Sequence, residues 1–238
     1  MNIPMVDLKG QYLTLKDEID TALIDALSAA QFILGPNVQA FEKEAAGYLG
    51  VEHAVGVASG TDALHLALAA AGIGEGDEVI TTPFTFIATA EAISYVGAIP
   101  VFVDIDPYTF NIDLDQLEQA ITSKTKAVIP VHLFGQPVDM NALKKLCDDK
   151  GLIIVEDCAQ SFGAHIDNRQ TGSFGDFGAF SFFPSKNLGC FGDGGLITTN
   201  DEKGANELRV LRNHGSRERY HHNVIGYNSR LDELQAII

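Results

Sequence analysis

Lys186 is the only basic residue between Gly175 and Gly195, a segment that is rich in glycine and phenylalanine. Apolar surroundings disfavour the charged ammonium form of a lysine because they remove its hydration. An uncharged amine is what Schiff-base chemistry requires. We therefore interpret Lys186 as a candidate nucleophile, with a surface lysine on a glycine-rich loop as the alternative.

Asp157 stands at the carboxyl end of the run LIIVED, residues 152–157, and we expect its carboxylate to be half-buried. A buried carboxylate is costly unless it meets a cation or a hydrogen-bond donor. Asp157 is therefore a candidate partner for a cationic ligand. A side chain that is satisfied by backbone amides at a turn explains this segment equally well.

Gly60, Thr61 and Asp62 follow a β-branched run at 53–59 and precede a helical pattern rich in alanine and leucine. The free N–H groups and the dipole at the start of such a helix attract phosphate. An ordinary helix cap is the alternative. The glycines of GIGEG at 72–76 precede a strand instead of following one, so they form no dinucleotide-binding fingerprint.

Phe84 and Phe86 follow the next run, at 78–82, and could either stack on a flat ring or form a hydrophobic staple into the following helix. A Schiff-base lysine, an acid, an aromatic ring and a phosphate seat are together what pyridoxal phosphate requires of a protein. The sequence therefore predicts this cofactor. The histidines and the clustered aspartates match no metal motif with a full ligand set, so we expect no metal.

These residues stand at the ends of short runs that are typical of β-strands, and helical patterns separate most of the runs. This alternation predicts an α/β fold of three layers, with a mostly parallel seven-stranded sheet covered on both faces. Ligands bind at the carboxyl ends of the strands in such sheets. No helix separates the last two runs, so one of them should be antiparallel. The expected strands are 53–59, 78–82, 99–104, 127–131, 152–157, 179–183 and 196–200, and the expected helices are 13–30, 36–49, 61–71, 85–96, 113–121 and 139–150, followed by a polar helical segment from 201 and a loop at 213–228.

The 238 residues carry a formal charge of −16, which disfavours nucleic acid as a partner because phosphate backbones attract basic surfaces. No stretch approaches the ~18 consecutive apolar residues of a membrane helix, and the N-terminus has no signal pattern, so we expect no membrane partner. Cys147, Cys158 and Cys190 are widely spaced, and three free thiols favour a cytoplasmic location.

Five segments of the chain, in the same order, resemble the DegT-type family of nucleotide-sugar aminotransferases, and the resemblance covers almost all 238 residues. Members of this family are pyridoxal-phosphate enzymes of fold type I, the aspartate-aminotransferase fold. The resemblance implies an N-terminal segment at 1–40 and a cofactor-binding large domain at 41–238. It also implies that the family's small C-terminal domain is absent from this chain, which ends within an expected helix. The five segments are SGTDAL (59–64), TPFTFIATA (82–90), VEDCAQSFGA (155–164), SFFPSKNLGCFGDGG (181–195) and GYNSRLDELQA (226–236).

The resemblance also implies roles for residues around the cofactor ring. Lys186 matches the lysine that forms the Schiff base and then moves a proton between the substrate and the cofactor. Asp157 matches the acid at the pyridine nitrogen, and Gln160 matches the polar residue beside the ring oxygen. Phe86 matches the aromatic residue that stacks on the ring, for which Phe84 is the weaker match.

Further matches concern the phosphate of the cofactor. Gly60, Thr61 and Ser181 match the phosphate cradle. Asn228 matches the residue that reaches the cofactor phosphate of the neighbouring subunit. That match implies a homodimer with shared active sites.

The expected reaction is transamination, in which L-glutamate supplies an amino group to a keto group of a nucleotide-linked sugar for cell-surface polysaccharide or deoxyamino-sugar synthesis. The forms of SFFPSKNLG and of Gln160 favour 3-keto over 4-keto sugars. Two alternatives are a sugar dehydratase of the same fold, for which some relatives carry histidine in place of the lysine, and a non-catalytic regulator that senses the cofactor or the sugar. A nicotinamide oxidoreductase is disfavoured because the first strand-to-helix turn lacks the required glycines.

Overall fold

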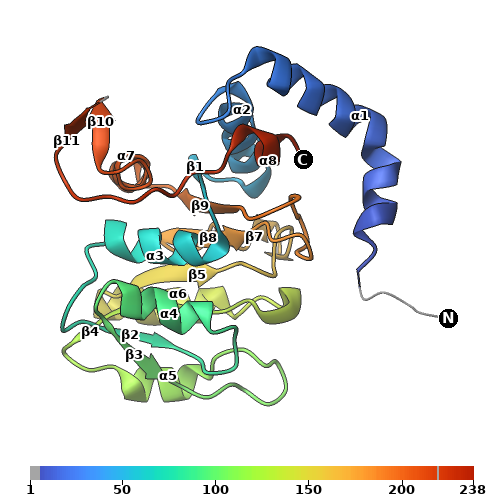
Figure 1. Cartoon of the computed structure of the whole chain (residues 1–238). Coiled ribbons are helices and arrows are strands. Elements are labelled where there is room, and N and C mark those ends of the chain that lie inside the picture. Colours follow the sequence, from blue (N-terminus) through green and yellow to red (C-terminus); the bar gives the residue numbers. More distant parts are fainter. Residues whose placement is uncertain (1–5, 219) are drawn as a thin grey trace.

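A seven-stranded sheet runs through the middle of the molecule, with helices on both faces (Figure 1). The computed structural model describes residues 6–218 and 220–238. In the order of the sheet, the strands are β1 (His53–Val57), β9 (Gly195–Thr199), β8 (Phe177–Ser181), β5 (Ile153–Asp157), β4 (Thr125–Val128), β2 (Glu78–Thr81) and β3 (Ile99–Phe102).

Strand β9 is antiparallel to both of its neighbours, β1 and β8, whereas the pairs from β8 to β3 are all parallel. The prediction that one of the last two runs is antiparallel is therefore confirmed. Each of the seven expected runs overlaps one strand of the sheet, to within three residues at either end.

Alternate residues of each strand pack into different cores because neighbouring side chains of a strand point to opposite faces. On β5, for example, Val155 belongs to one buried cluster and Ile154 to the other. The first face is covered by α3 (Gly60–Ala70), α4 (Ala88–Tyr95) and α7 (Glu202–Leu211), and the second by α2 (Pro36–Leu49), α5 (Leu114–Ala120) and α6 (Met140–Lys150). The expected three-layer α/β fold is thus confirmed.

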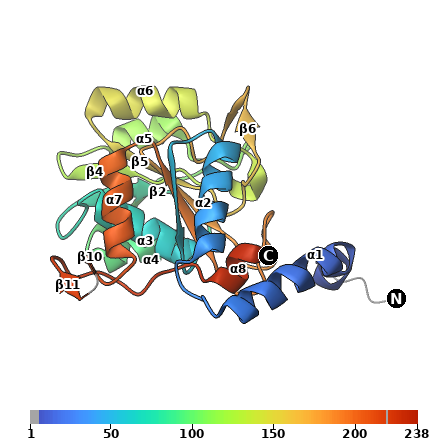
Figure 2. The ribbon, with the colours of Figure 1, turned by 90° about the horizontal axis from the view of Figure 1, so that it is seen from above.

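The first helix, α1 (Leu8–Ala29), projects away from these layers (Figures 1 and 2). It begins five residues before the expected start at residue 13 because Asp7 caps it, accepting a hydrogen bond from the Gly10 amide at 2.9 Å. The domain boundary at residue 40 stays a prediction; residue 40 lies inside α2, and residues 1–5 of the N-terminal segment lie outside the described residues. None of the helices in the described ranges is long and apolar enough to cross a membrane.

Two expectations about the last part of the chain were wrong. The loop expected at 213–228 contains a small hairpin of β10 (Ser216–Glu218) and β11 (His221–His222). The segment GYNSRLDELQA is helical only from Glu233, in α8 (Glu233–Ile237). Its earlier part is held extended against the end of α7, because the Tyr227 amide donates to Leu211 O at 2.7 Å and the Ser229 amide donates to Arg212 O at 3.0 Å.

The carboxylate of Glu233 anchors α8 to the start of α2. Gly35, the residue at the N-cap of α2, has no side chain to cap the helix. Glu233 replaces that cap, since its oxygens accept from the amides of Asn37 and Val38, both at 2.9 Å, while the side chain is completely buried. A carboxylate at a helix N-terminus is stabilised by the free N–H groups and by the helix dipole.

We expect Glu233→Gln to lower the free energy of unfolding by about 1–3 kcal/mol, because the new NH₂ group faces backbone donors and leaves them unpaired. Urea unfolding followed by circular dichroism measures this change. Glu202→Gln is the matched control, since Glu202 lies in the first turn of α7 but is exposed. Equal unfolding midpoints for the Glu233 variant and the control would show that the cap contributes nothing.

Candidate active site

A pocket of about 490 Å³ lies at the carboxyl ends of β5 and β8. This edge of an α/β sheet is where ligands bind. Seven of the eight residues predicted for the site line the pocket, namely Gly60, Thr61, Phe86, Asp157, Gln160, Ser181 and Lys186. Asn228 is absent from the lining residues.

Asp157 is the last residue of β5 and is 6% exposed, so it is buried rather than half-buried as expected. Both of its carboxylate oxygens are paired: Thr89 Oγ1 donates to Oδ2 at 2.8 Å, and the Ala159 amide donates to Oδ1 at 3.1 Å. Burial raises the pKa of Asp157, and these two hydrogen bonds and the positive charge of Lys186 act in the opposite direction. Such a carboxylate gains most when a cation enters the pocket beside it.

Lys186 lies on the loop between β8 and β9 and is partly buried in the wall of the pocket. The loop is folded tightly: the Lys186 amide donates to Phe183 O at 2.8 Å, and the Cys190 amide donates to Phe182 O at 2.9 Å. A Cβ on Gly189 would lie only 2.6 Å from Pro184 O, so a glycine is required there. The close turn explains the glycine-rich sequence, and it presents the one lysine of this loop to the pocket.

The start of α3 and the end of β8 form a narrow seat on one side of the pocket. Ser59 caps α3 by accepting from the Asp62 amide at 3.1 Å, and the first N–H groups of a helix have no acceptor within it. A Cβ on Gly60 would lie 2.5 Å from Ser181 Cβ, so only glycine lets the helix start approach Ser181 this closely. Backbone donors and a hydroxyl group therefore converge where an anion can bind.

Gln160 and Phe86 line other parts of the wall. Gln160 Oε1 accepts from the Phe134 amide at 2.7 Å, which leaves the Nε2 amide group of Gln160 as its remaining donor. Phe86 is 73% exposed at the pocket. Phe84 lies outside the lining residues, and its ring packs near that of Phe110 with centroids 6.0 Å apart. Of these two residues, Phe86 is therefore the one that lies at the pocket, and its stacking role stays a prediction.

Asn228 is exposed, and it forms a β-bridge with Asn213. The next residue, Ser229, is buried and donates from Oγ to Asp62 Oδ2 at 2.7 Å. The GYNSR segment therefore packs behind the start of α3 while Asn228 remains outside this chain's pocket. A contact between Asn228 and a neighbouring subunit stays a prediction.

Glu156 is a buried carboxylate that the sequence reasoning missed. It is adjacent to Asp157 on β5, so the two side chains point to opposite faces of the sheet. Glu156 is completely buried and accepts hydrogen bonds of 2.7–2.9 Å from the amides of Gly172, Phe174 and Gly175. It thereby fixes the glycine-rich loop that follows β7 (Arg169–Gln170).

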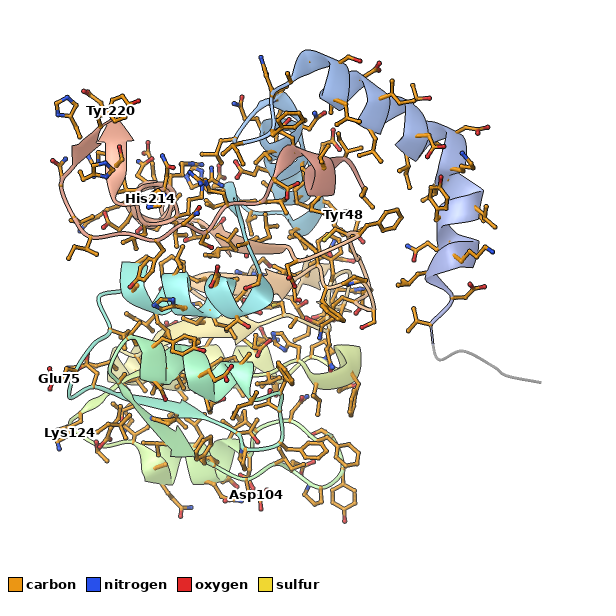
Figure 3. The ribbon with its side chains drawn as sticks, in the orientation of Figure 1. Tyr48, Glu75, Asp104, Lys124, His214 and Tyr220 are labelled. Carbon is orange, nitrogen blue, oxygen red and sulfur yellow. The ribbon has the colours of Figure 1, made fainter. Side chains whose placement is uncertain are left out.

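His132 connects Glu156 to the pocket. Its Nδ1 accepts from the Val138 amide at 3.1 Å, so Nε2 carries the proton and donates to Glu156 Oε2 at 2.9 Å. His132 also lines the pocket. These two residues and Cys158 lie close enough to hold a metal ion, but the oxygens of Glu156 already accept hydrogen bonds. The other histidines and the aspartates considered as ligands form two groups that are far from each other, with His214 and Asp104 at opposite ends of the sheet (Figure 3).

The pocket has the groups that pyridoxal phosphate requires. Lys186 supplies an amine, Asp157 a buried anion, Phe86 an aromatic face, and the seat at Gly60 and Ser181 a set of donors for a phosphate. The close approach of Gly60 to Ser181 is the most specific of these features, since any Cβ would fill the seat. The residues therefore fit this cofactor.

The fold superposes on solved aminotransferases of this class, which include structures with a ketimine intermediate and with bound PMP. Residues 13–238 match the model of the DegT/DnrJ/EryC1/StrS aminotransferase family, and the chain belongs to that family.

The chain is 58% identical over 236 residues to a UDP-N-acetyl-3-dehydro-alpha-D-glucosamine 3-aminotransferase of Acidithiobacillus ferrooxidans, covering 99% of this chain and 64% of that protein. It is 53% identical to a protein of Geobacillus stearothermophilus named "Pleiotropic regulatory protein", covering 100% of this chain and 64% of the relative. The crystal structure of DesV from S. venezuelae, solved with a ketimine intermediate, superposes with a TM-score of 0.97 at 50% identity, covering 99% of this chain and 63% of DesV. The chain thus spans somewhat less than two thirds of the length of these relatives.

Proposed function

We propose that the protein is a pyridoxal-phosphate aminotransferase that moves an amino group from L-glutamate to a keto group of a nucleotide-linked sugar. The observation that carries this proposal is the pocket that joins Lys186, Asp157 and the phosphate seat in one place. The name of the A. ferrooxidans relative supports a keto group at carbon 3 of the sugar. A product for cell-surface polysaccharides or deoxyamino sugars, and a cytoplasmic location, belong to the same proposal; the buried free thiols of Cys147, Cys158 and Cys190 support that location.

When bound, the cofactor supplies a carbonyl group for the amine and a ring that accepts the electrons of a carbanion. Lys186 Nζ would hold the cofactor through this carbonyl carbon, and the free amine would move a proton between the substrate carbon and the cofactor. Asp157 binds the protonated ring nitrogen, and its negative charge holds the proton there. Thr89 and the Ala159 amide keep the carboxylate in place for this task.

The remaining residues of the pocket bind the phosphate of the cofactor and orient its ring. The amides at Gly60 and Thr61 and the hydroxyl of Ser181 bind the phosphate, because a helix N-terminus attracts an anion. Gln160 donates from Nε2 to the ring oxygen. Phe86 covers one face of the ring and excludes water from it.

We further propose a homodimer with shared active sites. Phe86 and Phe134 are 73% and 76% exposed in the single chain, although both lie beside the pocket. Large exposed aromatic residues of this kind mark interaction surfaces. Asn228 from the second subunit would add a donor to the phosphate seat, and the two-fold symmetry would make this contact reciprocal.

Mixing Asn228→Ala protein with Lys186→Ala protein tests the shared site. Each mixed dimer holds one site with both lesions and one with neither, so random exchange should restore about a quarter of the wild-type activity. The measurement is transamination before and after subunit exchange, which differently tagged subunits verify. Activity that stays at the parental level after verified exchange would rule out shared sites.

Incubation of the protein with glutamate and a panel of 3-keto and 4-keto sugar nucleotides tests the reaction itself. We expect 2-oxoglutarate and an amino sugar in equal amounts, and formation of both should require both substrates. A dehydratase would instead form a deoxy sugar and no amino sugar.

The regulatory alternative has one observation in its favour, the name of the G. stearothermophilus relative. A regulator of this kind would bind the cofactor or the sugar nucleotide but form no product with any member of the panel. The lysine in the pocket favours the enzyme.

A further inference from the structure

Two threonines form a hydrogen-bonded chain that leads from the wall of the pocket to Asp157. Thr85 Oγ1 lies 2.9 Å from Thr89 Oγ1, and Thr89 Oγ1 lies 2.8 Å from Asp157 Oδ2. Thr89 is 1% exposed in the first turn of α4, whereas Thr85 is partly exposed and lines the pocket.

The direction of the chain follows from its hydroxyl protons. A hydroxyl group has one proton to donate, and an ionised carboxylate can only accept. The proton of Thr89 therefore points to Asp157, so Thr89 Oγ1 must accept the proton of Thr85. Thr85 thus fixes the orientation of the Thr89 hydroxyl, and the Thr89 hydroxyl in turn fixes one oxygen of Asp157.

The backbone around residue 85 explains how both hydroxyls reach this position. The helix expected from residue 85 begins instead at Ala88, because the preceding residues form a turn in which the Thr89 amide donates to Phe86 O at 3.2 Å. This turn places Phe86 at the pocket and Thr89 beneath it, against the end of β5. Thr85 and Thr89 are four residues apart, close enough for their hydroxyl groups to meet.

Other charged and titratable groups also surround the carboxylate. Lys186, from the loop after β8, favours its ionised form, while burial disfavours it; His132, from the loop after β4, is a further titratable group beside it. Glu156 and Cys158 are its neighbours in the chain. Thr89 is the side chain that donates directly to an oxygen of Asp157, so its loss should be felt most strongly.

We propose that Thr89 is a positioning residue that keeps Asp157 ionised and aimed at the ring nitrogen of the cofactor, with Thr85 setting the direction of the Thr89 hydroxyl. This inference rests on the proposed function, since it assumes that pyridoxal phosphate occupies the pocket. It adds to that function a pair of hydrogen-bonded threonines that hold the carboxylate of Asp157 in its ionised form at the ring nitrogen.

The test compares wild type, Thr89→Val, Thr89→Ser and Thr85→Val, with Ser94→Ala as a control on the exposed side of α4. Each protein is stripped of cofactor, and the dissociation constant of pyridoxal phosphate is measured between pH 5 and pH 8.5. Unfolding midpoints of the cofactor-free proteins show whether each variant is folded. Valine has nearly the shape of threonine but no donor, whereas serine retains the donor.

We expect Thr89→Val to weaken cofactor binding about 10- to 100-fold, the range for a lost hydrogen bond to a charged group. Without the donor, Asp157 takes up a proton at higher pH, so binding should weaken as the pH falls and should do so at a higher pH than in wild type. Thr89→Ser should restore both the affinity and the pH profile. Thr85→Val should show a smaller change, and Ser94→Ala none.

If a folded Thr89→Val protein binds the cofactor with the affinity and pH profile of wild type, the inference is wrong while the proposed function stands. The same holds if serine behaves like valine. If wild type itself fails to bind pyridoxal phosphate, the proposed function is wrong and the inference fails with it.

Discussion

Replacement of Lys186 by alanine should abolish both the covalent attachment of pyridoxal phosphate and measurable transamination. The variant loses the amine that binds the cofactor and the base that moves the proton, and a positioned base alone contributes roughly 10²- to 10⁴-fold to a rate. Lys186 is partly buried in the pocket wall. Its loop is held by backbone hydrogen bonds, so the fold should survive the substitution.

The measurements for this variant are the visible absorbance of the bound cofactor and the rate of 2-oxoglutarate formation. Lys126→Ala is the control, since Lys126 is an exposed lysine of β4 and should leave both values unchanged. An alanine variant at position 186 that still retains cofactor after borohydride reduction would assign the Schiff base to another residue.

Asp157→Asn should retain some cofactor yet lower the transamination rate by roughly two orders of magnitude or more, the scale of a broken buried ion pair. Asparagine has nearly the same shape but cannot carry the negative charge that keeps the ring nitrogen protonated. Steady-state rates with saturating cofactor measure the loss. Near-normal turnover in this variant would remove Asp157 from the mechanism.

Without the cofactor, the Asp157→Asn substitution should not lower the stability of the fold, although it lowers the rate. Burial raises the pKa of Asp157 in the folded state, so the ionised carboxylate costs stability at every pH above that raised value. Wild type should therefore become more stable as the pH falls from the raised pKa towards the ordinary value of an aspartate. Asp157→Asn should be at least as stable as wild type at neutral pH, and this advantage should shrink on acidification. Urea unfolding at a series of pH values measures the free energy of unfolding of both proteins and tests whether their difference changes with pH in this direction.

Much of the fold was predictable because the strands are short, β-branched and separated by helices. The antiparallel strand β9 followed from the lack of a helix between it and β8, and α2 begins at Pro36 as its sequence indicated. The start of α4 and the extent of α8 were mispredicted. In both places the backbone forms tertiary hydrogen bonds or turns that override the local helical pattern, as with the amides of Thr89 and Ser229.

The candidate site was predictable where a residue stands at the end of a strand or beside glycines that permit a close approach. Asp157, Lys186 and Gly60 are of this kind. Glu156 and Thr89 were missed because their roles depend on partners distant in sequence, Gly172 for the first and Asp157 for the second. Strand alternation places Glu156 on the face of β5 opposite to Asp157, but the sequence does not show that the donors for its carboxylate lie on a later loop.

The most direct test of the account is to reduce the protein with borohydride in the presence of pyridoxal phosphate, digest it and identify the modified peptide by mass spectrometry. We predict a single phosphopyridoxyl group, on Lys186 in the peptide that contains SFFPSKNLG. Modification of other lysines with Lys186 left free, or no stable modification at all, would contradict the claim that this pocket is a pyridoxal-phosphate site.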